Sequence, residues 1–482
     1  MQDLNPQHQY VFKKVSRAAE RLKQPAYVIG GYVRDYYLGR MEGNDLDIDF
    51  VTVGSGIKLA REVARELDTG RISVFKQFGT AQVKYQDMEL EFVGARKESY
   101  QRDSRKPVVE DGTLEDDQRR RDLTINVLSW SLNKEDFGTL IDPFDGWNDL
   151  QNKIIRTPVD PYQTFDDDPL RMMRAIRFAA ELNFKIEDDT FDAIRKMADR
   201  IKIVSRERIV TELNKIIMSP VPSYGFELLF KSGLLKEFFP EMHELHGVKE
   251  VNGVRHKDNL WHTLEVLDNV ARKSDNLWLR WAAIMHDIAK PATQKFVEGT
   301  GWTFHGHDAL GADWVESIFR RLGLPLDERM RYVRKLVRLH LRPIALVSDE
   351  VTDSAIRRLI YEAGDDIDDL MELCRADITS KNDRKVKQYM RNFDIVEQKI
   401  QEVEEKDRIR RWKNPIDGNE IMETLELDPG PVVGEIKDAI REAILNGDIP
   451  NEYDAAFDYM MKIKDQFVNP SSSEEQNDKS DS

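Results

Sequence analysis

GGYVRDYYLGRMEGNDLDID, residues 30–49, joins a glycine pair to a run of alternating acids. Gly30 and Gly31 follow an apolar run, and glycine lets the backbone turn tightly and lets a phosphate approach its amides closely. Asp47 and Asp49 alternate with apolar residues, which predicts a strand with both carboxylates on one face. Such carboxylates repel each other unless a cation such as Mg²⁺ lies between them. The stretch favours phosphoryl or nucleotidyl transfer, with an ordinary turn and a solvated strand edge as the alternatives.

The composition of the 482-residue chain predicts several globular domains without disulfides. Its single cysteine, Cys374, has no partner in the chain, and the sequence shows neither a signal-peptide core nor an apolar run of membrane-spanning length. We therefore expect a cytoplasmic protein with no membrane association and no evident protein partner. The formal net charge of −16 argues against a protein that coats nucleic acid non-specifically, but it allows a locally basic groove.

The segments around the opening stretch predict an α+β head. Its expected sheet is mixed and antiparallel-leaning, with helices packed on it. Glu91 lies on the last predicted strand, where it either brings a third catalytic carboxylate to the metal site or faces solvent. Helices are predicted over residues 1–25, 34–38 and 58–67, and strands over 71–75, 81–84 and 88–93.

A polar, charge-rich segment, residues 98–117, shows little periodicity and predicts a mobile loop. It leads into a run of arginines that ends at Arg121, and arginine side chains bind phosphate bidentately. Asp122 and Asn126 are four residues apart, so they would share a helix face and could hold a ribose. The alternative is a charged helix start, with Asp122 near the positive end of the helix dipole.

Beyond residue 150 the pattern becomes helical throughout. An acidic N-cap and a proline predict the start of a helix over residues 170–182. Arg171, Arg174 and Arg177 recur along one side of it, and such a pattern is typical of a solvated basic stripe. However, Asp168 accepts hydrogen bonds and Arg171 donates them one turn away, which suits reading the edge of a nucleobase.

A second chemical centre is predicted because six of the nine histidines fall between residues 251 and 343. Imidazoles mixed with carboxylates suit a divalent transition metal, or a pair of metals, that activates water. A single histidine is more often a satisfied core residue, but His286-Asp287 lies in an apolar helical segment, where burying the aspartate without a partner is costly. The candidate ligands are His262, His286, Asp287, His307, His340 and Asp377.

Taken in order, these motifs resemble the class II tRNA nucleotidyltransferase / poly(A) polymerase family fused to an HD domain, over roughly residues 20–380. The resemblance implies nucleotidyl transfer with two magnesium ions held at Asp47 and Asp49. It also implies an ATP- and CTP-binding pocket. The nucleotide-binding positions would be Gly30, Gly31, Arg34, Arg121, Asp122, Asn126, Asp168, Arg171 and Arg174.

Within this resemblance, Asp168 and Arg171 occupy the positions that select ATP and CTP by pairing with their bases. The family usually has Glu-Asp-x-x-Arg, whereas this chain has Asp167 in the first place, which leaves the supporting role of that acid open. Arg208 and Glu212 belong to a motif that steadies the neck. The histidine region resembles the HD phosphohydrolases, with His262, His286, Asp287 and Asp377 as metal ligands and His307 and His340 as outer ligands or phosphate contacts.

The function expected from the resemblance is addition of CCA to the 3′ end of tRNA from CTP and ATP. Alternatives are a poly(A) polymerase, an enzyme that adds only CC or only A, an HD phosphohydrolase acting on phosphate esters, and a non-enzymatic RNA-binding scaffold. The expected domains are a catalytic head (1–150), a neck for nucleotide selection and RNA binding (151–250), an HD domain (251–385), a helical region (386–468) and a disordered tail (469–482).

Overall fold

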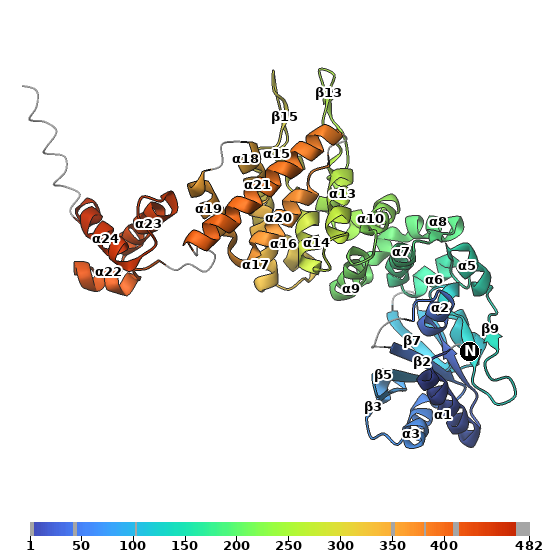
Figure 1. The fold of residues 1–482 in the computed structure, drawn as a ribbon. Coiled ribbons are helices and arrows are strands. Elements are labelled where there is room, and N and C mark those ends of the chain that lie inside the picture. Colours follow the sequence, from blue (N-terminus) through green and yellow to red (C-terminus); the bar gives the residue numbers. More distant parts are fainter. Residues whose placement is uncertain are drawn as a thin grey trace, which may run out of the picture. The chain divides into compact units, whose positions relative to one another are not determined.

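The structure is a computed structural model that describes residues 4–41, 46–101, 104–348, 352–379, 382–407 and 414–468. The chain forms two compact units, Met1–His243 and Glu244–Ser482. The large sheet belongs to the first unit, which begins in blue in Figure 1. The tail predicted to be disordered, residues 469–482, lies outside the described residues.

One seven-stranded sheet forms the head, in the strand order β3-β4-β5-β2-β1-β8-β9. The neighbours β2 and β5 are parallel, and the remaining neighbours are antiparallel. The mixed, antiparallel-leaning sheet predicted from the sequence is therefore confirmed. Its strands are β1 (Ala26–Ile29), β2 (Leu46–Thr52), β3 (Ile72–Phe75), β4 (Thr80–Tyr85), β5 (Met88–Gly94), β8 (Ser129–Ser131) and β9 (Leu140–Ile141).

Aromatic packing buries one face of this sheet. The ring of Phe50 on β2 stacks on Phe92 of β5 at a centroid distance of 4.8 Å and meets Phe12 edge to face at 5.9 Å. Phe12 comes from α1 (Pro6–Leu22), which together with α2 (Gly31–Tyr37) and α3 (Gly56–Glu66) corresponds to the three helices predicted for the head. Since side chains alternate along a strand, the acids of β2 point to the opposite face. The packing thus leaves the polar face of β2 available for a site.

The segment predicted as a mobile loop, residues 98–117, is instead largely a β-hairpin followed by a helix, so that prediction is wrong. β6 (Arg96–Gln101) pairs antiparallel with β7 (Ser104–Asp111), and α4 (Leu114–Arg119) follows. The register sets Arg96 opposite Asp111 and Lys97 opposite Glu110. These paired positions carry charged residues in place of an apolar alternation, which is why the sequence pattern did not reveal the hairpin.

The helical neck completes the first unit. The predicted helix over residues 170–182 is confirmed as α7 (Leu170–Leu182), but Asp168 is the C-cap of the preceding helix α6 (Pro161–Asp167), and Pro169 is the N-cap of α7. The other helices of the first unit are α5 (Gly146–Asn152), α8 (Asp188–Met197), α9 (Arg206–Ile217), α10 (Pro222–Lys231), α11 (Leu234–Phe238) and α12 (Pro240–His243).

Helix is not continuous beyond residue 150, which corrects that prediction. Two-stranded sheets pair β10 (Ile154–Ile155) with β11 (Lys185–Ile186), β12 (Glu250–Val251) with β13 (Val254–Arg255), and β14 (Lys295–Val297) with β15 (Gly301–Thr303). The turn of the second pair is Asn252-Gly253, and both residues have positive φ. Asn-Gly is the preferred sequence for such a hairpin turn, so this signal was present in the sequence and was missed.

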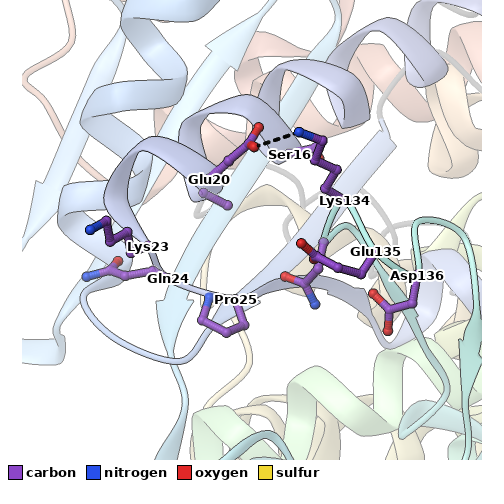
Figure 2. A pocket seen from close by; sticks show the side chains of 10 residues that line it. Ser16, Glu20, Lys23, Gln24, Pro25, Lys134, Glu135 and Asp136 are labelled. Atoms are coloured by element: carbon purple, nitrogen blue, oxygen red, sulfur yellow. Dashed lines mark hydrogen bonds and ion pairs between the residues drawn. The ribbon is translucent and has the colours of Figure 1, made fainter.

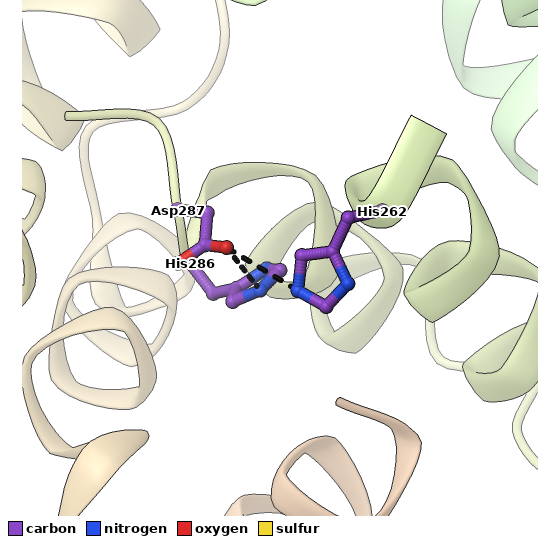
Figure 3. A group of neighbouring side chains, drawn as sticks. All are labelled: His262, His286 and Asp287. Carbon is purple, nitrogen blue, oxygen red and sulfur yellow. Dashed lines mark ion pairs between the residues drawn. The ribbon is translucent and has the colours of Figure 1, made fainter. Parts of the chain in front are cut away.

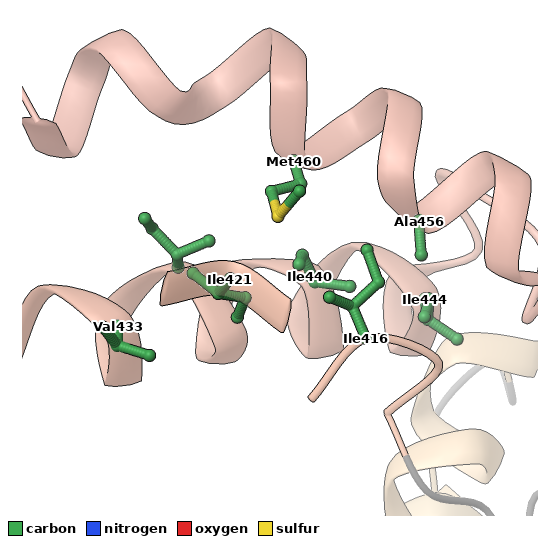
Figure 4. Close-up of a cluster of buried hydrophobic side chains, with 8 residues drawn as sticks. Ile416, Ile421, Val433, Ile440, Ile444, Ala456 and Met460 are labelled. Atoms are coloured by element: carbon green, nitrogen blue, oxygen red, sulfur yellow. The ribbon is translucent and has the colours of Figure 1, made fainter. Parts of the chain in front are cut away.

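The second unit is otherwise helical, and Figure 4 shows a small core of its own among its last three helices. Ile421, Ile440 and Met460 are fully buried there, one on each helix. No helix in the described ranges is both long enough and apolar enough to cross a bilayer. The helices of this unit are α13 (Asn259–Ala271), α14 (Leu277–Met285), α15 (Lys290–Thr293), α16 (His307–Leu322), α17 (Glu328–Leu339), α18 (Leu341–Ser348), α19 (Asp353–Ala363), α20 (Ile367–Ala376), α21 (Asp383–Asp407), α22 (Gly418–Leu425), α23 (Pro431–Asn446) and α24 (Tyr453–Val468).

Candidate functional site

The head carboxylates, Asp47, Asp49 and Glu91, lie on adjacent parallel strands. The register pairs Asp47 with Glu89 and Asp49 with Glu91, so the three side chains share the sheet face opposite the aromatic core. Asp47 is exposed, whereas Asp49 and Glu91 are half-buried. The geometry therefore places Glu91 beside the two acids of β2 and partly removes it from solvent.

Burial and mutual repulsion raise the pKa of all three head carboxylates. Burial is the larger cause for each of them. Glu89 adds to it at Asp47, Asp47 at Asp49, and Asp49 at Glu91, while Arg121 partly opposes the rise at Asp49. Oxygen donors with such an excess of negative charge fit a hard divalent cation. Among the residues that the structure describes, however, none of these three carboxylates belongs to a group of three donor atoms within 4.8 Å of one another.

Gly30 has φ +87°, a conformation that favours glycine, and precedes α2 directly. A Cβ on it would lie 3.5 Å from Asp49 Oδ2 and 3.4 Å from Arg121 NH1, so glycine leaves space beside both side chains. Gly31 begins α2. The predicted phosphate-binding turn is thus next to the acids on the same unit.

Arg34, also predicted to bind nucleotide, is buried and engaged with protein groups. Its Nε and NH2 donate to the two carboxylate oxygens of Asp35 at 2.9 and 2.8 Å, and its NH1 donates to Asn126 Oδ1 at 2.6 Å. The structure therefore places Arg34 where it orients Asn126.

Asp122 and Asn126 come together without the helix predicted for them. The segment Thr124–Asn126 is a 3-10 turn, and Asn126 Nδ2 donates to Asp122 Oδ1 at 3.2 Å. Arg174 Nε donates to the other oxygen of Asp122 at 2.6 Å. Burial alone would raise the pKa of Asp122, but Arg174 and Asn126 hold it at about 2. Asp122 is therefore ionised near pH 7, and hydrogen bonds fix it and Asn126 in place.

The three arginines of α7 do not form a solvated stripe, because each reaches a different protein group. Arg171 NH2 donates to the carbonyl of Arg120 at 2.7 Å. Arg174 holds Asp122, and Arg177 lies 3.2 Å from Glu212 of α9. Glu212 of α9 therefore forms an ion pair with an arginine of the neighbouring helix α7.

Three contacts at this site were not predicted from the sequence. Asp117 is fully buried and pairs with Arg120 at 2.6 Å and Arg121 at 3.2 Å. Arg208 of α9 donates to Asp168 Oδ2 at 2.8 Å. The spacing of Asp117 three and four residues before the arginines was a usable signal, because such residues are neighbours on a helix. The Arg208 contact joins residues 40 positions apart and had no local signal.

A cavity of about 400 Å³ unites these parts of the head and neck. It brings two head carboxylates together with the predicted ribose, phosphate and base residues. Of the predicted nucleotide-binding residues, Gly30, Gly31, Arg34 and Asn126 do not line it. The lining residues are Asp49, Glu91, Val93, Arg120, Arg121, Asp122, Asp168, Leu170, Arg171, Arg174 and Arg208.

A second cavity of the head, about 480 Å³ and shown in Figure 2, contains none of the predicted residues. This cavity lies by the first residue of β1, whereas the head carboxylates lie near the last residue of that strand. Its charges are mixed, and Lys134 pairs with Glu20 across it at 3.1 Å. Size alone therefore does not identify the chemical site.

The second unit gathers the histidine–aspartate cluster, namely His262, His286, Asp287, His307, His340 and Asp377. Asp287 is central: its Oδ2 lies 3.4 Å from His262 Nε2 and 3.2 Å from His286 Nε2 (Figure 3). Its other oxygen, Oδ1, lies 3.2 Å from His307 Nε2 and 3.9 Å from His340 Nε2. Asp377 Oδ1 adds a contact of 2.9 Å to His262 Nε2. Two potential ligand groups thus share Asp287.

The backbone orients these imidazoles for metal binding. The Nδ1 atoms of His286, His307 and His340 lie 2.7, 2.7 and 2.6 Å from the carbonyls of Ala283, Phe304 and Val337. A carbonyl only accepts, so each Nδ1 carries the proton and each Nε2 faces the cluster. His286 Nε2 is buried and lies 3.2 Å from Asp287 Oδ2, but this contact does not have the geometry of a hydrogen bond. This orphaned atom fits a metal ligand.

Charge within the cluster is balanced by protons. Burial alone would lower the pKa of His286, but the carboxylate of Asp287 raises that pKa to about 10. Burial alone would raise the pKa of Asp287, yet His286 and Lys290 hold the pKa of that carboxyl well below its usual range. Burial lowers the pKa of His340 to about 4, so His340 is neutral near pH 7. Mixed nitrogen and oxygen donors of this kind suit a transition metal, which would displace the His286 proton.

One detail of the predicted cluster is wrong. The sequence placed His286 and Asp287 within a helix, but α14 ends at Met285 and His286 is its C-cap. The apolar pattern of α14 continues through Ile288 and Ala289, which hid the end of the helix.

Family models cover most of the chain. The model described as "Poly A polymerase head domain" matches residues 26–156, and "Probable RNA and SrmB-binding site of polymerase A" matches residues 183–245. The model "HD domain" matches residues 260–380, and a model of tRNA nucleotidyltransferase domain 2 matches residues 344–460.

Solved structures show the same fold. A Bacillus stearothermophilus CCA-adding enzyme in complex with CTP matches 97% of this chain and 100% of its own with TM-score 0.67 and 22% identity. A Thermotoga maritima CCA-adding enzyme complexed with tRNA matches 95% of this chain and 96% of its own with TM-score 0.61 and 20% identity.

Curated relatives are more similar in sequence. The A-adding tRNA nucleotidyltransferase of Aquifex aeolicus is 34% identical over 64% of this chain, but the match spans only 36% of that protein. The A-adding tRNA nucleotidyltransferase of Deinococcus radiodurans is 32% identical over 71% of this chain and 78% of its own length. With identity and coverage at this level, and with head, RNA-binding and HD models in the expected order, the chain belongs to the tRNA nucleotidyltransferase / poly(A) polymerase family.

Proposed function

We propose that this protein adds CCA to the 3′ end of tRNA from CTP and ATP. The observation that carries the proposal is the single cavity that joins Asp49 and Glu91 of the head to Asp122, Asp168 and Arg171. Acids for a metal, a ribose acceptor and an acceptor–donor pair for a base are the parts that template-independent nucleotidyl transfer needs. The names of the relatives support the tRNA substrate.

In this proposal the 3′-hydroxyl oxygen of tRNA attacks the α-phosphorus of the nucleotide, and pyrophosphate leaves. Asp47 and Asp49, with Glu91, would hold Mg²⁺, which neutralises the charge developing on the phosphates and acidifies the hydroxyl. Arg121 contacts phosphate oxygens. The chain contributes chiefly by positioning and electrostatics.

The nucleotide itself would be held by groups that the structure has already fixed. Asp122, ionised and paired with Arg174, accepts from the ribose together with Asn126. Asp168 accepts from the amino group of cytosine or adenine, and Arg171 donates to a ring acceptor. In this division the head, residues 1–150, carries the chemistry, and the neck, residues 151–250, selects the nucleotide.

The test is product length on a tRNA transcript that lacks its CCA end. We expect two added residues with CTP alone and three with CTP and ATP together. Because both curated relatives are named A-adding, a tRNA that already ends in CC is the necessary second substrate. One added residue on that substrate, with none on the shorter one, would establish an A-adding enzyme instead. A long adenosine tail would establish a poly(A) polymerase.

A second candidate activity, metal-dependent hydrolysis of phosphate esters, rests on the histidine–aspartate cluster. Its inward Nε2 atoms and shared Asp287 are arranged for metal ions that activate water. Hydrolysis of bis(p-nitrophenyl) phosphate with added Mn²⁺ or Ni²⁺ tests it. The proposal requires that the activity survive Asp47→Ala and disappear in Asp287→Ala, and equal rates in both variants would refute it.

A further inference from the structure

Both carboxylate oxygens of Asp168 are engaged by the protein. The backbone N–H of Leu170 donates to Oδ1 at 3.1 Å, and Arg208 NH2 donates to Oδ2 at 2.8 Å. Arg208 lines the same cavity as Asp168. The carboxylate is therefore held at the cavity wall from two sides, by the first residue of α7 and by α9.

The neighbouring donor, Arg171, is held differently. Its NH2 donates to the carbonyl of Arg120 at 2.7 Å and its NH1 to the carbonyl of Thr164 at 3.3 Å. The proposed base acceptor and base donor thus depend on separate supports. A change at Arg208 would disturb the acceptor and leave the donor in place.

Fixing the acceptor has a chemical consequence for base choice. A carboxylate paired with a guanidinium only accepts hydrogen bonds. Cytosine and adenine present an amino donor, whereas uracil presents a carbonyl oxygen at the corresponding position, and two acceptors repel. An Asp168 free to turn could bind a bridging water that donates to that carbonyl, and the discrimination would weaken.

Building on the proposed function, we infer that Arg208 is a positioning residue that lets Asp168 discriminate amino-bearing bases from uracil. It acts through Asp168 and does not touch the substrate. The alternative, in which Arg208 leaves Asp168 to bind a phosphate, affects every nucleotide equally. The two interpretations differ in the ratio of kcat/KM for CTP to kcat/KM for UTP, which can be measured within each variant.

The experiment compares kcat/KM for CTP and for UTP on a tRNA transcript that lacks CCA. In Arg208→Gln we expect the CTP/UTP ratio to fall about threefold to tenfold, the range for a partly exposed charged pair. Arg208→Lys should restore most of the ratio. Arg206→Gln is the matched control, because Arg206 is an exposed arginine on the same helix that does not line the cavity. It should match the wild type.

An unchanged ratio in Arg208→Gln would overturn the inference, and so would equal increases in KM for CTP and UTP. The ratio is internal to each variant, so a partly unfolded preparation does not mimic the expected result. Failure of the wild-type protein to incorporate any nucleotide would instead refute the proposed function. The two failures are therefore distinguishable.

Discussion

The head carboxylates and the histidine–aspartate cluster both bring acids close together, but the two sites balance that charge in opposite ways. In the head, burial and repulsion raise the pKa of Asp47, Asp49 and Glu91. In the cluster, histidines lower the pKa of Asp287 and Asp377 against the effect of burial. The head therefore needs a cation from outside, whereas the cluster carries protons that a metal would replace.

The largest effect should come from Asp49→Asn, which removes a charge that the metal requires. We expect incorporation to fall by about a thousandfold, since metal-ion stabilisation of the transition state amounts to several kcal/mol. Stability should not fall, because ionised Asp49 is unfavourable in the folded state. Incorporation assays and urea unfolding of the same preparation check both points. A fall in the free energy of unfolding would mean that protein groups already balance the charge of Asp49, as they do for the acids of the cluster.

Asp287→Ala, unlike Asp49→Asn, should lower the stability of the protein. We expect a loss of about 3 kcal/mol in the free energy of unfolding without metal, because it leaves buried imidazolium groups unpaired. Asp313→Ala, which removes an exposed acid from the same unit, is the control and should cost less than about 1 kcal/mol. Urea unfolding in chelator measures both.

The loss in Asp287→Ala should also depend on pH. The pKa of His286 is raised from 6.5 to about 10, so its stabilisation is complete below pH 6.5 and is lost as the pH rises through 10. The difference between wild type and variant should therefore narrow from pH 7 towards pH 10. A constant difference would show that the His286–Asp287 pair does not carry the charge balance.

A smaller effect is expected at Asp122, the one acid of the head cavity that resembles the cluster. Its pKa is lowered from 3.8 to about 2, so its stabilisation is complete above about pH 4 and is lost as the pH falls through 2. Asp122→Asn should cost about 1–2 kcal/mol at pH 7, allowing for the partly exposed Arg174. The difference in the free energy of unfolding between the wild type and the variant should be smaller at pH 3 than at pH 7. An equal difference at both pH values would contradict the ion pair.

Local patterns predicted much of this molecule. Alternation along β2 revealed the acids at 47 and 49, and apolar periodicity revealed α1 and α7. The order of motifs also indicated the candidate pairs Asp122 with Asn126 and Asp168 with Arg171, because each pair lies within about one turn of chain. Clustering of histidines along the sequence was enough to identify the second centre.

Other features depend on contacts that no local pattern records. The hairpin β6–β7 carries charged residues opposite one another at its base and shows little apolar alternation, so its residues looked like a loop. Arg208 meets Asp168 across 40 positions, and only the packing of α9 beside α7 brings them together. The end of α14 at Met285 was hidden because core residues continue past it. In each case tertiary packing decided what propensity left open.

Incorporation of radiolabelled CTP by Asp47→Ala and Asp287→Ala, measured side by side on a tRNA transcript that lacks CCA, tests the central claim most directly. If the head pocket performs nucleotidyl transfer and the cluster is a separate centre, Asp47→Ala incorporates no label and Asp287→Ala, assayed at a temperature where it remains folded, incorporates it at the wild-type rate. Label incorporated by Asp47→Ala, or none by folded Asp287→Ala, would contradict the assignment.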